Sequence, residues 1–209
     1  SVSAHALAAW HAAGLKWLTA DGMRERAIVA FEHASNIDPT FEDVFSRLSE
    51  LYAEEGRTGD LAELLERRLA GAEDDDERAH LEVELGRTLA ELGDDEAARK
   101  MFRRALDKRP DNTHALALYA ELSAKRKDWE AAEHSWVRLA RLLPTQDEQR
   151  GVYERLGDLY AKHSLNYARA EVAWREVLKR DERNENALLR LVEVYRAQDN
   201  TAQAIETYE

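Results

Sequence analysis

Apolar and small residues recur along the chain with a period of 34 residues. Between residues 79 and 112 the apolar, small and turn-forming positions follow one order: Leu85, Gly86, Leu89, Gly93, Ala98, Phe102, Ala105 and Pro110. A second set stands one period later in the same register: Leu116, Tyr119, Ala120, Ser123, Ala132, Trp136, Leu139 and Pro144. Two consecutive matches without a gap are hard to obtain by chance, so the pattern predicts a repeat protein.

The order of these positions resembles the tetratricopeptide repeat, a helix-turn-helix unit with the pattern W-x2-L-G-x2-Y, then a small residue, an aromatic, another small residue and proline. The unit that starts near Ala79 fills every position except the first aromatic one, where the chain has Glu82. Small insertions bring four further units into register, and the sixth stops inside its second helix. We expect a single array over residues 1–209, with units at approximately 7–41, 42–78, 79–112, 113–146, 150–184 and 185–209.

This resemblance implies an all-α fold, in which antiparallel helix pairs stack into a right-handed superhelical solenoid. One pair alone cannot bury its apolar stripe, so neighbouring pairs are expected to cover it. We expect the first aromatic residues of the units, such as Trp10, Phe45 and Tyr153, to be buried between helices.

The prolines and tryptophans of the chain stand at positions that the repeat assigns to them. All three prolines, Pro39, Pro110 and Pro144, stand at the end of a unit, so no proline or tryptophan is left over for a catalytic loop. The second unit departs from the pattern, because it ends in an acidic run at residues 73–77. That run is either a functional acidic patch or a solvated loop whose carboxylates cap the next helix.

Composition narrows the chemistry. The chain has no cysteine, which excludes disulfides and thiolate metal sites, and its formal net charge of −12 disfavours nucleic acid and membrane surfaces. No histidine pair lies three or four residues apart, and no Gly-rich phosphate loop is present. We therefore expect no enzyme, no catalytic residue, no metal and no cofactor. One alternative stays open: His80 and His114 occupy equivalent positions in adjacent units, where they would form a pH-sensitive or metal contact.

If the resemblance holds, the outward-facing side chains of each first helix line a concave groove. The groove residues that we expect are mixed in charge with a moderate negative bias: His11, Leu15, Glu50, Glu54, His80, Arg87, Glu91, His114, Glu121, Lys125, Glu154, Asp158, Lys162, Asn186 and Glu193. Val83 is assigned to the same surface. The Lys and Asn with which some family members clamp a C-terminal carboxylate are missing. The groove therefore favours a peptide segment or partner helix with basic and apolar residues.

The leading prediction is a non-catalytic protein-interaction scaffold. The 23 Arg against 7 Lys favour a bacterial source, and the lack of a targeting segment favours a cytoplasmic location. The alternative is a structural or assembly segment of a larger protein or oligomer, with no groove ligand. RNA binding by helical repeats needs a basic groove and is disfavoured. Because the sixth unit stops in mid-helix, we also expect a segment of a longer protein whose uncapped ends are available for self-association.

Overall fold

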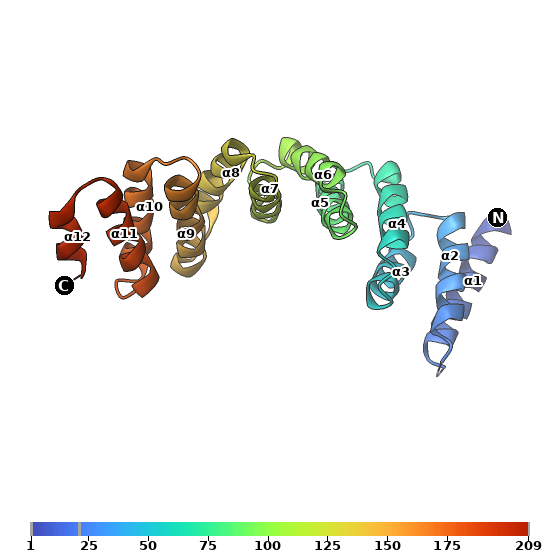
Figure 1. Ribbon diagram of the computed structural model, residues 1–209. Coiled ribbons are helices and arrows are strands. Elements are labelled where there is room, and N and C mark those ends of the chain that lie inside the picture. The colour runs from blue at the N-terminus through green and yellow to red at the C-terminus, as the bar shows by residue number, and fades with distance from the viewer. Residues whose placement is uncertain (1, 21, 209) are drawn as a thin grey trace. The chain divides into compact units, whose positions relative to one another are not determined.

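The structure, a computed structural model, describes residues 2–20 and 22–208. Over these residues the chain forms twelve α-helices and no strand (Figure 1). In chain order they are α1 (Val2–Leu18), α2 (Arg24–Ile37), α3 (Glu42–Glu54), α4 (Thr58–Gly71), α5 (Asp75–Glu91), α6 (Asp95–Lys108), α7 (Thr113–Lys125), α8 (Trp129–Leu142), α9 (Gln146–Lys162), α10 (Tyr167–Arg180), α11 (Glu185–Ala197) and α12 (Thr201–Tyr208). The predicted all-α helical repeat fold is confirmed.

The helices fall into two compact units. Unit 1 covers residues 1–109 and contains α1 to α6, and unit 2 covers residues 110–209 and contains α7 to α12. Within each unit a helix packs on its neighbours in the chain, most extensively in the pairs α1–α2, α5–α6, α7–α8 and α9–α10. Each of these pairs is one helix-turn-helix repeat.

Polar side chains mark where helices begin. Most of the helices start after a residue whose side chain accepts a hydrogen bond from the backbone N–H three positions later, among them the helices that follow Asp94, Asn112, Asp128, Asn166 and Asn184. Such caps satisfy one of the N–H groups that a helix start leaves unpaired. Thr145 and Glu148 form a capping box at α9, which therefore begins at Gln146 rather than near residue 150.

Glycine allows the two helices of a pair to cross closely. A Cβ atom at Gly86 of α5 would lie 2.6 Å from the ring of Phe102 on α6, and one at Gly157 of α9 would lie 2.5 Å from the ring of Trp174 on α10. Atoms that close cannot be accommodated without a shift. The glycine position of the repeat is thus explained by the aromatic ring that it faces.

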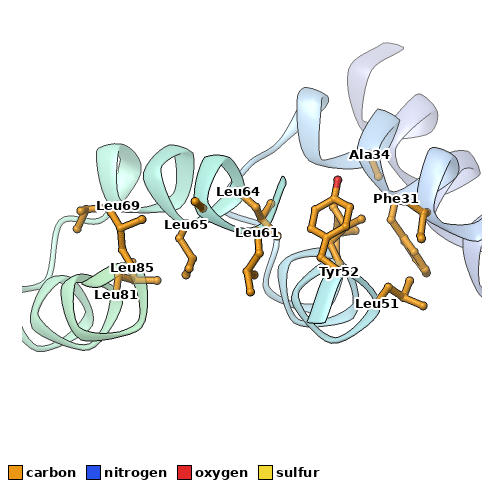
Figure 2. Packing of buried hydrophobic residues seen from close by; sticks show 14 of the residues in the cluster. Phe31, Ala34, Leu51, Tyr52, Leu61, Leu64, Leu65, Leu69, Leu81 and Leu85 are labelled. Atoms are coloured by element: carbon orange, nitrogen blue, oxygen red, sulfur yellow. The ribbon is translucent and has the colours of Figure 1, made fainter. Parts of the chain in front are cut away.

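The core of unit 1 is a continuous layer of aliphatic and aromatic side chains. Figure 2 shows Leu61, Leu65 and Leu69 following one another along α4, with Leu81 and Leu85 of α5 beside the far end of this row. All five side chains are at most 8 % exposed. Because α4 packs on both α3 and α5, it joins the second and third helix pairs into one core.

The first aromatic position of the repeat is not buried as expected. Trp10, Phe45 and Tyr153 are each only half-buried. A polar side chain of the following helix covers one face of each ring: His33 stacks on Trp10 at 4.4 Å, Arg68 lies 5.4 Å from the ring centre of Phe45, and Arg180 lies 4.5 Å from that of Tyr153. Guanidinium groups favour the face of an aromatic ring, so at Phe45 and Tyr153 an arginine takes the place of a neighbouring apolar side chain.

Tyrosines near the end of the first helices α3 and α9 connect successive helix pairs. The hydroxyl of Tyr52 donates to Glu32 of the preceding helix at 2.8 Å. Tyr160 likewise donates to Glu133 at 3.0 Å, and burial and this carboxylate raise the pKa of Tyr160 to about 12. A buried hydroxyl that is bonded to a carboxylate resists ionisation, so these bridges persist at neutral pH.

The acidic run at residues 73–77 serves the fold. The Asp74 side chain accepts the backbone N–H groups of Asp76 and Glu77 and so caps α5. The carboxylates of Asp76 and Glu77 pair with Arg109 and Arg68 at 2.6 and 2.7 Å. The acidic run is therefore explained by two structural roles: it caps the start of α5, and it forms ion pairs with Arg68 and Arg109.

Candidate protein-binding surface

A depression of about 210 Å³ lies between the second and third helix pairs of unit 1. Its floor is apolar and its rim is polar: the lining residues are Phe45, Ser49, Ala53, Leu61, Leu65, His80, Leu81, Glu84 and Arg87. Side chains from α3, α4 and α5 thus converge on one place. Concave sites with an apolar floor and a few polar groups at the edge are typical of binding sites.

Arg87 stands at the rim between two carboxylates of its own helix. Its guanidinium donates to Glu84 at 3.0 Å and to Glu91 at 2.7 Å. Burial alone would lower the pKa of Arg87, but the hydrogen bonds and charges of the two glutamates outweigh it and raise that pKa. The cation is therefore neutralised within α5, and this part of the rim carries a net negative charge.

The predicted groove residues of α1 are used inside the protein. His11 Nε2 lies 2.5 Å from Asp43 Oδ2 of α3, and the hydrogen bond with His11 and the nearby Arg47 hold the pKa of Asp43 below its usual value. Leu15 packs partly buried against the core of unit 1. Both residues fasten α1 to the helices that follow it and present little surface to a ligand.

In unit 2 the four predicted acidic groove residues each have a basic neighbour. Glu121 binds Arg155 of α9 at 3.1 Å, and Asp158 binds Lys162 at 2.9 Å. The other two carboxylates also have basic neighbours: Glu154 lies 3.9 Å from Arg150, and Glu193 lies 2.9 Å from Arg190. The first helices of unit 2 therefore present alternating charges that satisfy one another.

The remaining predicted residues are exposed. Glu50, His80, His114 and Asn186 have exposed side chains with no polar partner within the described part of the chain. Glu54 pairs with Arg24 at 3.2 Å, and the side chains of Lys125 and Lys162 are exposed. His80 belongs to unit 1 and His114 to unit 2.

The assignment of Val83 to the groove is wrong, because its side chain is 2 % exposed and lies in the core. Glu84, the next residue, lines the depression instead. One position along a helix rotates a side chain by about 100°, which is enough to exchange a core face for a surface face.

Sequence reasoning missed three cations that pair with carboxylates of the first helices, namely Arg47 in unit 1 and Arg155 and Arg190 in unit 2. One signal was available for Arg155, since it follows Glu121 by 34 residues, which is one repeat. Equivalent positions of successive first helices are neighbours in such an array, so opposite charges one period apart indicate an ion pair.

Within residues 2–20 and 22–208, no group of three or more His, Cys, Asp or Glu side chains is arranged to hold a metal ion. Over the same residues, no helix has the length and apolar character needed to span a membrane.

Comparisons with known proteins agree on the type of repeat. Two family models described as tetratricopeptide repeat match residues 79–122 and 186–209. No curated protein matches the sequence.

Several solved structures share the fold at low sequence identity. The C-terminal part of a TPR repeat-containing protein from Cytophaga hutchinsonii has a TM-score of 0.69 at 18 % identity, with 88 % of this chain and 73 % of that chain covered. PilF from Pseudomonas aeruginosa has a TM-score of 0.59 at 21 % identity, with 99 % and 90 % covered. YrrB, described as a TPR protein with an unusual peptide-binding site, has a TM-score of 0.61 at 19 % identity, with 79 % and 81 % covered. The family models thus identify tetratricopeptide repeats at residues 79–122 and 186–209, and the solved structures show that the chain shares the fold of tetratricopeptide repeat proteins.

Proposed function

We propose that the chain is a protein-interaction scaffold and that it binds a segment of a partner protein in the depression between α3 and α5. Tetratricopeptide repeat proteins in general mediate protein–protein interactions, and their fold is typically non-catalytic. The observation that carries the proposal is the depression itself, whose apolar floor is open at a polar rim. An apolar side chain of the partner would enter it and be removed from water.

The charge around the depression favours a partner segment with basic residues. Unit 1 has 15 Lys and Arg against 24 Asp and Glu, a net charge of −9, whereas unit 2 has 15 against 18, a net charge of −3. Glu50, which follows the lining residue Ser49 in α3, is exposed without a polar partner in the described residues, and Arg87 at the rim is shared by Glu84 and Glu91. A lysine or arginine next to an apolar residue would meet complementary charge here.

The test fills the depression with a bulky side chain. Ala53→Trp places an indole over the apolar floor, and Ala70→Trp adds the same group to an exposed position of α4 outside the depression. The probe is a fluorescein-labelled peptide of alternating Lys and Leu. We expect Ala53→Trp to weaken binding by about ten-fold or more and Ala70→Trp to leave it unchanged. Equal binding by both variants would exclude the depression as the site.

A charge variant next to the depression examines the electrostatic contribution separately. Glu50→Lys should weaken binding of the same peptide and reduce its dependence on salt, because one favourable charge contact becomes unfavourable. Glu63→Lys on α4 changes the net charge equally at an exposed position outside the depression and serves as the control. A similar loss in both variants would indicate a general effect of net charge.

The second candidate function is assembly through the last helix pair. An apolar depression of about 230 Å³ is lined by Glu185, Leu188, Leu189, Val192 and Thr207, and Leu189 is 56 % exposed. A contact between copies would cover this face. Sedimentation of the wild type and of Leu189→Glu tests it: a concentration-dependent mass that the substitution abolishes supports assembly, and a monomeric wild type excludes it.

A further inference from the structure

Ion pairs link successive first helices of unit 2 at two positions of the repeat. The fifth residue after the first aromatic position is a carboxylate, Glu121 in α7 and Asp158 in α9. The second residue after that position in the next first helix is an arginine, Arg155 in α9 and Arg190 in α11. The guanidinium of Arg155 lies 3.1 Å from Glu121, and that of Arg190 lies 3.8 Å from Asp158. These two repeat positions therefore face each other across neighbouring first helices.

In unit 1 the same two positions hold carboxylates on both sides where α3 meets α5. The fifth residue after the first aromatic position of α3 is Glu50, and the second residue after that position in α5 is Glu84. Glu84 lines the depression, and Glu50 follows the lining residue Ser49. The repeat thus places two like charges opposite each other beside the depression, where unit 2 has a charge and its countercharge. Like charges at such a distance repel unless a cation lies between them.

Both carboxylates have acceptor capacity left in the described part of the chain. Glu50 is exposed and has no polar partner there. Arg87 binds Glu84 only at Oε2, through Nε at 3.3 Å and Nη2 at 3.0 Å, so Oε1 of Glu84 accepts no hydrogen bond from a described residue. The remaining terminal nitrogen of Arg87 is bound to Glu91 at 2.7 Å. A further cation is therefore needed to satisfy Glu50 and the free oxygen of Glu84 together.

The geometry of two facing carboxylates favours a guanidinium over an ammonium group. A guanidinium is planar and carries five N–H donors in a fixed fork, so it can donate to two carboxylates at once. It is also more weakly hydrated than an ammonium group, which lowers the cost of placing it beside the apolar floor of the depression. In unit 2 the countercharges at the equivalent position, Arg155 and Arg190, are both guanidinium groups.

From this comparison we propose that an arginine of the partner segment binds between Glu50 and Glu84, while an adjacent apolar side chain of the segment enters the depression. The arginine takes the place that Arg155 has against Glu121 in unit 2. This inference rests on the proposed function, because it specifies the basic residue of the segment that binds the depression. Charge complementarity and the apolar floor beside the two carboxylates argue for this occupant.

Three fluorescein-labelled peptides of equal length test the choice of cation: alternating Arg and Leu, alternating Lys and Leu, and alternating citrulline and Leu. Citrulline keeps the shape of arginine without its charge. We expect the Arg peptide to bind about five-fold more tightly than the Lys peptide and at least about ten-fold more tightly than the citrulline peptide. Glu84→Gln should remove most of the preference for arginine over lysine. Glu91→Gln removes the other carboxylate bound to Arg87 and should keep the preference, so it serves as the matched control.

A second pair of variants tests the geometry without a ligand. Glu50→Arg supplies a guanidinium from α3 opposite Glu84, so it should raise the melting temperature and weaken binding of the Arg peptide at least about ten-fold. Glu63→Arg changes the net charge equally at an exposed position of α4 outside the depression. It controls for the general relief of repulsion in an acidic chain, so Glu50→Arg should melt higher than Glu63→Arg.

Equal melting of Glu50→Arg and Glu63→Arg overturns the inference, because the two carboxylates then do not face each other. An Arg peptide that binds the wild type no more tightly than the Lys peptide overturns it as well, and so does a preference that survives Glu84→Gln. These results leave the proposed function standing where Ala53→Trp still weakens binding of the peptides. If none of the three peptides binds the wild type, the proposed function fails and this inference fails with it.

Discussion

The helix pairs α3–α4 and α5–α6 are neighbours in unit 1, yet they fill the first aromatic position of the repeat in opposite ways. In α3 the position holds Phe45, half-buried beneath the guanidinium of Arg68. In α5 it holds Glu82, whose side chain is completely buried. Lys108 Nζ lies 2.9 Å and Arg104 Nε lies 3.1 Å from the carboxylate of Glu82.

Both pairs therefore bring a cation from the second helix to the same position of the first helix. The cation binds either an aromatic face or a carboxylate. The residue at this position therefore needs to interact with a cation, and it need not be aromatic. Removal of the cation should affect the two pairs differently. An aromatic ring without its cation is still an apolar group in apolar surroundings, whereas a buried carboxylate without its cations keeps a negative charge that nothing compensates.

The largest effect is expected when the buried carboxylate loses both partners. Arg104→Met with Lys108→Met should lower the free energy of unfolding by about 3–5 kcal/mol, because the charge of Glu82 stays buried without compensation. Urea unfolding followed by circular dichroism measures this. Adding Glu82→Phe to the double variant should recover most of the loss, since an apolar ring needs no cation there.

The control removes two cations from the exposed face of the same helix. Lys100→Met with Arg103→Met should change the free energy of unfolding by no more than about 0.5 kcal/mol, as is usual for exposed positions. A result for the Arg104 and Lys108 variant that equals this control would contradict the role given to the buried ion pairs.

The glycine position gives the next largest difference between the two pairs. Gly86→Ala places a Cβ atom 2.6 Å from Phe102, and such overpacking should cost about 1–3 kcal/mol of unfolding free energy. In α3 the equivalent residue is Ser49, which already carries a side chain and donates to the carbonyl of Phe45. Ser49→Gly should cost only the difference in helix propensity, about 0.5 kcal/mol. Equal costs would mean that the two crossings are equally close.

The repeat spacing predicted the helix pairs because it reports short-range geometry. Gly86 lies in α5 and Phe102 in α6, and one short turn joins these helices. Their contact therefore follows from helix periodicity and the length of the unit. The proline and glycine positions follow in the same way. The family and the all-α fold were therefore accessible from the sequence alone.

The candidate surface was less predictable, because its chemistry depends on which side chains meet across helices. The sequence placed His11 and Asp158 in a groove as ligand-binding groups, but only the structure shows that His11 bonds Asp43 and that Asp158 bonds Lys162. Nothing in the local sequence distinguishes a buried Glu82 from a solvated one. Positive φ angles at Lys127 and Leu165 were equally hidden, since neither residue type favours them.

A third difference concerns the tyrosine that follows the glycine position. Tyr52 of α3 donates to Glu32 and lies beneath Arg57, whereas α5 has Leu89 at that position. Tyr52→Phe should lower the free energy of unfolding by about 1 kcal/mol through the lost hydrogen bond.

The same tyrosine predicts a dependence on alkaline pH. Burial and the hydrogen bond to Glu32 raise the pKa of Tyr52. A raised pKa in the folded state gives stability that is complete below the unfolded value of about 10 and is lost as the pH rises towards the folded value. Above about pH 10, the free energy of unfolding of Tyr52→Phe should therefore fall less steeply with pH than that of the wild type. An unchanged alkaline profile would contradict the bridge.

The smallest effects are expected in the turns, where the two helix pairs should behave alike. Gly56 and Gly93 have φ angles of +67° and +85°, and a Cβ atom at either would meet no neighbour within 4 Å. Substitution by alanine should therefore cost about 1 kcal/mol of unfolding free energy through backbone strain alone, with similar values in both pairs.

Gly59 provides the matched control, because it lies in α4 without a positive φ and with equally open surroundings. Gly59→Ala should raise the free energy of unfolding by about 0.5–1 kcal/mol, since alanine is the better helix former. If Gly56→Ala and Gly59→Ala shifted stability in the same direction, the backbone conformation of the turn would not be the cause.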